Sequence, residues 1–417
     1  MKVLVIGSGG REHAIVRQFK NSPSVTEVFV APGNDGMKKD ATCVAIDSLE
    51  FDILTAFVHE NAIDLTFVGP EQPLAEGIVD YFEAQGLRIF GPTKAAAQIE
   101  GSKTFAKELM IKYNIPTAAY ETFTDVNEAK DYIRKMGAPI VIKADGLASG
   151  KGVIVAMTLE EAIYSVEDMI GNQKFGESSS RVVIEEFLEG EEFSYMSFVH
   201  NGQIYPMVIS QDHKRAYDGD RGPNTGGMGA YSPVPHLPES VIQQTYDSIV
   251  LPTVEAMATE GTPFSGILYA GVILTDDGPK VIEFNARFGD PETQVVLPRM
   301  TSDFGQFMTA LLNGKPFELK WSNDAILGVV IASYGYPWQV KKGAILPDFS
   351  KFNKDIQVFH AGTKEVDGYF VGNGGRVILV TSKSSTLKQA EQQVYAALAE
   401  YNWEGFFYRT DIGWRAL

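Results

Sequence analysis

The run EFNARFGDPETQ combines residue types that can hold a metal ion beside a phosphate. On a strand, Glu283, Asn285 and Arg287 would share one face, while the apolar residues between them pack behind it. Mg²⁺ is typically held by one or two protein oxygens together with water and phosphates, so this face suits a metal that bridges phosphates. The turn that follows adds Asp290 and Glu292 around a proline. The alternative, an edge strand with a solvated polar face, leaves these two carboxylates unexplained.

Two lysines flank a glycine-rich loop in the segment IKADGLASGKGV. Lys143 would end one strand, and Gly150 and Lys151 would precede the next, so two ammonium groups lie beside a loop that can fold over a polyphosphate. The segment is not a P-loop, because Gly-Lys is followed by glycine and then by a strand. A solvated hairpin with incidental lysines is the alternative, but so much glycine costs chain entropy unless the loop must move.

Clustered acids follow an apolar strand in VVIEEFLEGEE. Between two domains, the backbone groups of such a segment could bind the edge of an adenine, and a carboxylate such as Glu191 could accept hydrogen bonds from ribose hydroxyls. A solvated acidic face is the alternative interpretation.

The turn GSGGREHA follows a strand and opens a helix, so backbone N–H groups, the helix N-terminus and Arg11 would meet whatever binds there. This arrangement suits a phosphate. A dinucleotide fingerprint would need glycine at Glu12 and an acidic residue where Asn34 ends the second strand, so a nicotinamide enzyme is disfavoured. Glycines that only permit a tight turn remain the alternative.

Residues 211–232 form a long polar segment, which includes DHKRAYDGD and NTGGMGAY, and show no helical or strand period. Loops of this length are uncommon unless they are functional, and the glycines predict close backbone approach to a ligand. The histidines show neither zinc-ligand spacing nor a nucleophile triad.

The chain length of 417 residues predicts several domains, since single cores stop growing near ~250–300 residues. In the first hundred residues, β-branched runs alternate with helical patterns, which predicts a doubly wound parallel sheet. Glycine or proline turns follow these strands at the edge where open α/β sheets bind ligands. Strands are expected at 2–6, 25–30, 65–68, 87–90, 140–144, 153–156, 181–185, 266–275, 280–284, 328–333, 357–362 and 377–382, with helices at 159–170, 238–260 and 386–400.

The formal net charge of −17 argues against a nucleic-acid partner, because backbone binding depends on Lys and Arg. The single cysteine, Cys43, cannot form an internal disulfide or a multi-thiolate metal site. Apolar runs stay well short of the ~18 residues that a membrane span requires. These observations predict a cytoplasmic protein with no membrane partner.

Taken together and in this order, these motifs resemble the glycinamide ribonucleotide synthetase family of the ATP-grasp superfamily, and the similarity extends over essentially the whole chain. The runs RFGDPETQ and GPNTGGMGAY are the most distinctive. The resemblance implies a mixed α/β and α+β multidomain fold. Its domains are a Rossmann-like domain (1–101), an ATP-grasp region (102–324, with a mobile lid at about 116–187 and a catalytic subdomain at about 188–324) and a small carboxyl-terminal domain (325–417).

By position, the resemblance also implies roles for individual residues. The catalytic group that organises glycine and the γ-phosphate would be Arg287, Asp290 and Glu292. Contacts to ATP would come from Lys103, Lys143, Gly150, Lys151, Glu185, Glu186, Phe187, Leu188 and Glu191. Phosphoribosylamine would be bound by Gly9, Gly10, Arg11, Asp212, Asn224, Thr225, Gly226 and Gly227. Mg²⁺ or Mn²⁺ would be held by Glu283 and Asn285.

The implied reaction is the ligation of glycine to phosphoribosylamine by a monomer, through glycyl phosphate formed with ATP. The sequence departs from the wider superfamily at 266–274, where a strand that often supplies a second metal-binding carboxylate has none. Three alternatives remain open: an ATP-grasp carboxylase that activates bicarbonate, an NAD-binding dehydrogenase and a catalytically silent nucleotide-binding module.

Overall fold

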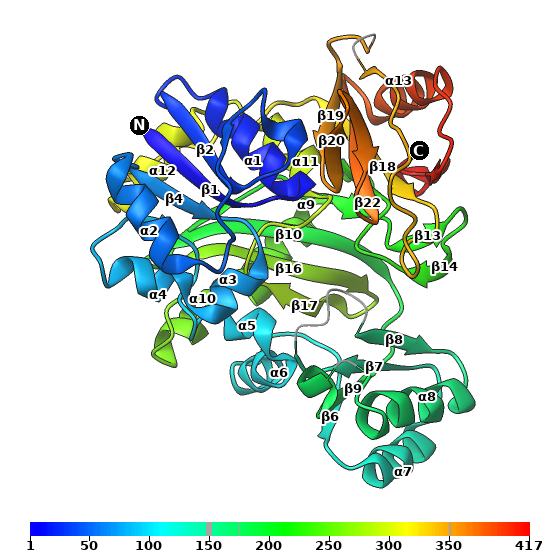
Figure 1. The fold of residues 1–417 in the computed structure, drawn as a ribbon. Helices are drawn as coiled ribbons and strands as arrows, with labels where there is room; N and C mark the ends of the chain where they lie inside the picture. Colours follow the sequence, from blue (N-terminus) through cyan, green and yellow to red (C-terminus); the bar gives the residue numbers. More distant parts are fainter. Residues whose placement is uncertain (147–151, 175, 350–351) are drawn as a thin grey trace.

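The computed structural model describes residues 1–146, 152–174, 176–349 and 352–417. Four larger sheets organise this part of the chain, and the amino-terminal and carboxyl-terminal units lie side by side above the antiparallel sheet of the middle region (Figure 1). The lid, with helices α7 and α8, projects from the opposite side of that sheet.

The amino-terminal unit is a five-stranded sheet in the order β3-β2-β1-β4-β5, and its paired strands are all parallel. The expected doubly wound sheet is therefore confirmed. Its strands are β1 (Lys2–Gly7), β2 (Glu27–Pro32), β3 (Thr42–Cys43), β4 (Leu65–Val68) and β5 (Ile89–Phe90). Its helices are α1 (Gly10–Lys20), α2 (Phe51–Glu60), α3 (Glu71–Glu76) and α4 (Ile78–Glu83). The connection to the lid contains α5 (Gln98–Gly101) and α6 (Lys103–Lys112).

The lid is a four-stranded antiparallel sheet in the order β6-β9-β7-β8. Two helices cover one face through a separate small apolar core that includes Ile133, Ile142 and Val166. Its elements are β6 (Tyr120–Phe123), α7 (Val126–Met136), β7 (Ile140–Ala144), β8 (Val153–Ala156), α8 (Leu159–Val166), a π-helical turn (Glu167–Gly171), a 3₁₀ turn (Gly176–Ser179) and β9 (Val182–Glu186).

The middle region is built on an antiparallel sheet in the order β11-β10-β16-β17. Strand β17 lies at the edge next to the lid, and Thr117 bridges to Val281 there. The strands are β10 (Glu191–His200), β11 (Gln203–Pro206), β16 (Gly266–Thr275) and β17 (Gly278–Asn285). The helices are α9 (Glu239–Thr245), a π-helical segment (Tyr246–Val250), α10 (Leu251–Thr259), α11 (Thr293–Val296), a 3₁₀ turn (Leu297–Arg299) and α12 (Phe304–Leu312).

The carboxyl-terminal unit is a six-stranded sheet in the order β12-β15-β18-β22-β19, with β23 also paired to β18. Helix α13 (Leu387–Ala399) packs on it, and the side chain of its N-cap residue Thr386 accepts from the Gln389 amide. The strands are β12 (Gln211–Asp212), β15 (Gly229–Ser232), β18 (Ala325–Ser333), β19 (Ile356–His360), β22 (Arg376–Ser384) and β23 (Phe406–Phe407), with a hairpin of β20 (Thr363–Val366) and β21 (Tyr369–Gly372) and a final 3₁₀ turn (Trp414–Ala416).

The prediction that 211–232 contains no strands is wrong. Strands β12 and β15 pair with each other, β15 adds to the edge of β18, and β13 (Arg215–Tyr217) with β14 (Arg221–Asn224) forms a hairpin. Strands of two to four residues are too short to show an alternating pattern, and their pairing depends on β18, which lies far along the chain.

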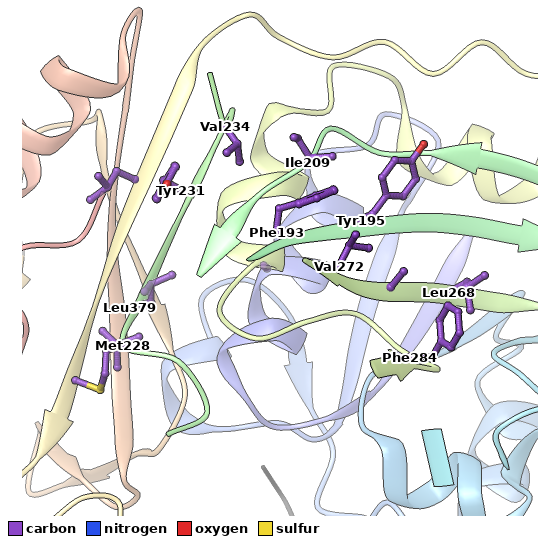
Figure 2. Packing of buried hydrophobic residues seen from close by; sticks show 14 of the residues in the cluster. Phe193, Tyr195, Ile209, Met228, Tyr231, Val234, Leu268, Val272, Phe284 and Leu379 are labelled. Atoms are coloured by element: carbon purple, nitrogen blue, oxygen red, sulfur yellow. The ribbon is translucent and has the colours of Figure 1, made fainter. Parts of the chain in front are cut away.

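A continuous apolar core joins the middle sheet to the carboxyl-terminal sheet (Figure 2). It contains Phe193 and Tyr195 of β10, Leu268 and Val272 of β16 and Phe284 of β17, together with Tyr231 and Leu379 of the carboxyl-terminal sheet. A second core joins the amino-terminal sheet to α12, where the rings of Phe19 and Phe304 lie 4.4 Å apart. Aromatic burial of this kind fixes the units around the site. Among the described helices, none combines the length and apolarity that crossing a bilayer would require.

Candidate active site

Strand β17 carries a bulge beside the predicted metal ligands. Val281 pairs with Val272 and Glu283 pairs with Gly271, so Ile282 is an extra residue in the strand. The bulge breaks the strict alternation expected from the sequence: Val281 and Phe284 both lie in the core, and the strand ends at Asn285. Bulges re-aim the backbone groups and side chains near them.

The oxygens of Glu283 and Asn285 fit a divalent cation. Neither side chain has a hydrogen-bond or ion-pair partner within the described residues. Although burial opposes ionisation, surrounding cations hold the pKa of Glu283 below its ordinary value. In order of influence, these cations are Lys214, Lys143, Lys103 and Arg287. An ionised, unpaired carboxylate beside an amide oxygen is a donor set that Mg²⁺ accepts, with water and phosphates completing its shell.

No cluster of three or more His, Cys, Asp or Glu side chains forms in the ranges that the structure covers. Within that part of the chain, side chains alone therefore supply few metal ligands.

Two predicted phosphate lysines converge on this strand. Lys143 Nζ donates to the carbonyl of Ile282 at 2.8 Å, next to Glu283. Lys103 Nζ donates to the Gly146 carbonyl at 3.3 Å, and burial lowers the pKa of Lys103 against the opposing influence of Glu283. Both lysines thus face the same space between the lid and β17. The predictions for Gly150 and Lys151 lie outside the described residues.

The predicted adenine-binding segment joins the lid to the middle sheet. Glu186, Phe187 and Leu188 line a cavity of about 440 Å³, which the turn after β16 closes on another side. Glu185 lies elsewhere: it is 4% exposed and forms ion pairs with Lys143 and Lys107.

The carboxylate of Glu191, the predicted ribose acceptor, contacts His236 and receives the Gln211 amide at 3.2 Å.

Arg287 is held by carboxylates of the amino-terminal unit. Its guanidinium lies 3.3 Å from Glu71 and 2.8 Å from Glu100. Although burial opposes the charge, Glu100 and Glu71 raise the pKa of Arg287 above its ordinary value. Burial raises the pKa of Glu100, even though Arg287 opposes this effect. Arg287, which follows β17, is therefore held by α3 and α5 next to the predicted metal ligands Glu283 and Asn285.

The two acids of the turn after Arg287 have different partners. Asp290 accepts from Gln294 at 2.9 Å and lies 3.4 Å from Arg376. Burial opposes its ionisation, yet Arg376 and Arg11 hold the pKa of Asp290 below its ordinary value. Glu292 accepts from the hydroxyls of Tyr269 at 2.6 Å and Ser194 at 3.3 Å. The turn therefore offers one carboxylate held by cations and one held by hydroxyls.

The glycine turn at α1 is already contacted by carboxylates. The Gly9 amide donates to Glu12 at 2.6 Å, and the Arg11 amide donates to Asp290 at 3.3 Å. The Arg11 guanidinium is buried and bonds to Glu12 and to the Phe288 carbonyl. Gly10 packs against Gln294, whose amide nitrogen would lie 2.7 Å from an added Cβ. An incoming phosphate would displace some of these contacts, so this role remains a prediction.

The NTGG segment is fixed by side chains of the carboxyl-terminal unit. Arg376 Nη1 donates to the carbonyls of Gly226 at 2.6 Å and Asp290 at 2.7 Å, and the Tyr336 hydroxyl accepts from the Gly226 amide at 2.9 Å. Gly227 has a φ of +111°, and a Cβ there would lie 2.5 Å from Pro291. Glycine is therefore required where this segment meets the turn.

The residues on either side complete this end of the site. The Thr225 hydroxyl donates to the Lys214 carbonyl at 2.8 Å and accepts from the Gly227 amide at 3.0 Å. Asn224 ends β14 opposite Arg215. Burial raises the pKa of Asp212 to about 7, while Lys214 opposes the shift.

Several residues around the site were missed from the sequence. Arg376 follows the turn NGG and begins a strand, and a charged residue at that edge was the available signal. Tyr269 sits in an apolar strand and Lys107 in an ordinary amphipathic helix, so neither gave one. The residues missed are Lys107, Ser194, Lys214, Tyr269, Gln294, Tyr336 and Arg376.

The lid, the antiparallel sheet and the charged groups between them define an ATP-grasp protein. Residues 101–293 match the model of the phosphoribosylglycinamide synthetase ATP-grasp (A) domain, residues 1–100 its N domain and residues 326–415 its C domain. The chain belongs to the phosphoribosylglycinamide synthetase family.

Known relatives agree with this family over the whole chain. Phosphoribosylamine–glycine ligases from Halalkalibacterium halodurans and Streptococcus pneumoniae are 57% and 54% identical, and the matches cover 100% of this chain and 97% and 100% of theirs. The crystal structure of the Thermotoga maritima enzyme of the same name superposes with a TM-score of 0.86 at 34% identity, covering 99% of this chain and 100% of that one.

The carboxylase alternative shares the fold alone. A Campylobacter jejuni biotin carboxylase superposes with a TM-score of 0.73 at 13% identity, over 98% of this chain and 91% of that one.

Proposed function

We propose that the protein joins glycine to phosphoribosylamine with ATP, giving glycinamide ribonucleotide, ADP and phosphate in purine biosynthesis. The observation that carries this proposal is a hydrogen bond between the lid and β17. Lys143 Nζ donates to the Ile282 carbonyl at 2.8 Å, next to Glu283. Phosphoryl transfer is catalysed mainly by positioning and charge stabilisation, and the position of Lys143 next to Glu283, a proposed metal ligand, supports this role.

The first step activates glycine. A carboxylate is a poor electrophile, so one of its oxygens attacks the γ-phosphorus of ATP, the bond to the bridging oxygen breaks, and ADP leaves. Lys103 and Lys143 bind phosphate oxygens, and Arg287, fixed by Glu71 and Glu100, stabilises the transferred group. Glu283 and Asn285 would hold Mg²⁺ or Mn²⁺, which when bound neutralises phosphate charge.

The second step forms the amide. The amine of phosphoribosylamine attacks the carbonyl carbon of glycyl phosphate, phosphate leaves, and the nitrogen loses one proton. Asp212 and the segment Asn224–Gly227 border the acceptor, and Gly9, Gly10 and Arg11 receive its phosphate by displacing contacts to Glu12. Because the acyl phosphate hydrolyses readily, closure of the lid protects it from water.

ADP release measured with each substrate alone and with both tests the proposal. We expect turnover only when glycine and phosphoribosylamine are both present, because the amine discharges the intermediate. Turnover supported by bicarbonate in place of glycine would overturn the assignment. We further propose that the protein is a monomer in the cytoplasm. Sedimentation at the mass of one chain would support the monomer, and a stable dimer would refute it.

A further inference from the structure

Lys107 is a buried lysine of α6 that none of the steps above uses. Its side chain is 3% exposed, and its Nζ donates to the Thr117 hydroxyl at 2.8 Å and to the Ala118 carbonyl at 3.2 Å. A third contact reaches Glu185 Oε2 at 3.2 Å. An ammonium group has three donors, so Lys107 is fully paired. Lys107 thus contacts Thr117 and Ala118, where the chain enters the lid, and the carboxylate of Glu185 within the lid.

Glu185 holds two ammonium groups at once. While Oε2 faces Lys107, Oε1 lies 2.9 Å from Lys143 Nζ. The carboxylate is 4% exposed. A buried charge must be paired, so the two lysines divide the attraction of one carboxylate between them.

Lys143 uses two of its three N–H donors for contacts within the protein. They are directed to Glu185 Oε1 at 2.9 Å and to the Ile282 carbonyl at 2.8 Å, which leaves one N–H for a ligand. The contacts run from α6 through the lid strands β9 and β7 to β17. Lys107 stands at the start of this series and Lys143 at the end that faces the metal-type oxygens.

We propose that Lys107 is a positioning residue for ATP, which holds Glu185 so that Lys143 remains available to the phosphates. The inference rests on the proposed phosphate contact of Lys143. Without Lys107, Glu185 would attract Lys143 alone and hold its ammonium more tightly against the lid. Burial lowers the pKa of Lys107 to about 8, with Glu185 opposing the shift, so the group carries its charge at neutral pH.

Steady-state kinetics of Lys107→Met test this inference. We expect the KM for ATP to rise about tenfold, while the KM values for glycine and phosphoribosylamine stay within about twofold, because the residues proposed to bind those substrates, such as Asp290 and Arg11, have no contact with Lys107. Lys107→Arg retains a cation beside Glu185 and should return the KM for ATP to within about threefold of the parent value. The matched control is Lys112→Met on the same helix, whose side chain is 62% exposed and pairs with Glu260; it should change none of these constants.

Other outcomes overturn the inference. A purely structural role for Lys107 would lower Tm while leaving the KM for ATP unchanged, or would damage all three KM values together. If Lys107→Met does not fold, Lys107→Gln, which retains a donor for Thr117, takes its place with the same expected split. Lys143→Met distinguishes a failure of this inference from a failure of the proposed function. If Lys143→Met leaves ATP binding intact, the proposed phosphate contact of Lys143 is wrong. If Lys143→Met weakens ATP binding but Lys107→Met does not, only the inference about Lys107 is refuted.

Discussion

The two ends of the proposed site are assembled differently. The ATP end (Lys103, Lys143, Glu185 and Glu283) comes from α6, the lid and β17, which are joined by the bridge between Thr117 and Val281. The acceptor end (Asp290, Gly226, Gly227 and Arg376) joins the turn after β17, the NTGG segment and β22, and the amide of Arg11 reaches Asp290 from 279 residues away in the sequence.

This difference concerns what holds each end in place. At the ATP end, charged side chains lie on or beside paired strands, so sheet register sets their positions. At the acceptor end, Arg376 binds carbonyls of two other segments through its guanidinium, so docking between units sets the geometry. Damage to contacts between units should therefore impair acceptor binding before it impairs ATP binding.

The variant with the largest expected effect tests whether phosphoryl transfer takes place at the ATP end. Glu283→Gln should lower kcat by about 100-fold or more and change ATP affinity only a few-fold, because the lost charge matters most as phosphoryl charge develops. Rapid-quench measurement of ADP formation, together with nucleotide titration, checks both values. Glu318→Gln, whose side chain is 83% exposed and pairs with Lys320 away from the ATP end, is the control and should behave like the parent. A near-normal kcat in the Glu283 variant would make this strand structural.

The second prediction separates the two ends directly. Arg376→Met should lower kcat/KM for phosphoribosylamine by about 10- to 100-fold, because the Gly226 and Asp290 carbonyls lose their shared donor. ATP affinity, measured by titration, should stay within about twofold. Lys383→Met on the same strand removes an exposed pair with Asp324 and is the control. An equal loss of ATP affinity would show that the two ends are not independent.

A pH profile tests the acceptor end alone. Burial raises the pKa of Asp212 to about 7, so the carboxyl is protonated below and ionised above that pH. If the ionised form assists the amine, kcat/KM for phosphoribosylamine should rise several-fold from pH 6 to pH 8. Asp212→Asn should remove that part of the rise, and any slope that remains belongs to the substrate. Identical profiles for the two proteins would leave Asp212 without a role.

The smallest expected effect concerns the contact between α1 and β19. His13 Nε2 bonds to Asp40 at 2.9 Å, and its Nδ1 accepts from the His360 amide at 2.9 Å. Burial lowers the pKa of His13 to about 4 from 6.5. As pH falls from 6.5 towards 4, the unfolded chain therefore takes up a proton at His13 before the folded chain does. The free energy of unfolding decreases over this range by roughly 2–3 kcal/mol at most.

Thermal unfolding at pH 7 and pH 5 measures this loss. His13→Gln should reduce the acid-dependent fall in Tm, whereas His59→Gln, on the exposed face of α2, should leave it unchanged. If all three proteins lose the same Tm, the weak point in acid lies elsewhere.

Local patterns were sufficient to predict much of the fold. The parallel sheet followed from β-branched runs between helical patterns, and the helix expected at 386–400 is α13, for which Thr386 serves as the N-cap. The strands of 211–232 were missed because each spans only a few residues and becomes a strand by pairing with a distant partner such as β18. The bulge at Ile282 has no local signal, yet it leaves the carbonyl that Lys143 binds.

The sequence by itself determined the class of chemistry, because carboxylate, amide, guanidinium and glycine at short fixed spacings leave few other uses for such residues. It also determined the family and the strand that carries Glu283 and Asn285. The tertiary structure alone decided that Glu185 binds two lysines, that Arg11 is already bonded to Glu12 and Phe288, and that Arg376 closes the acceptor end. The physical reason is range: turn chemistry and periodicity act within a few residues, whereas most of these contacts join residues that are far apart in the sequence and meet only in the folded chain.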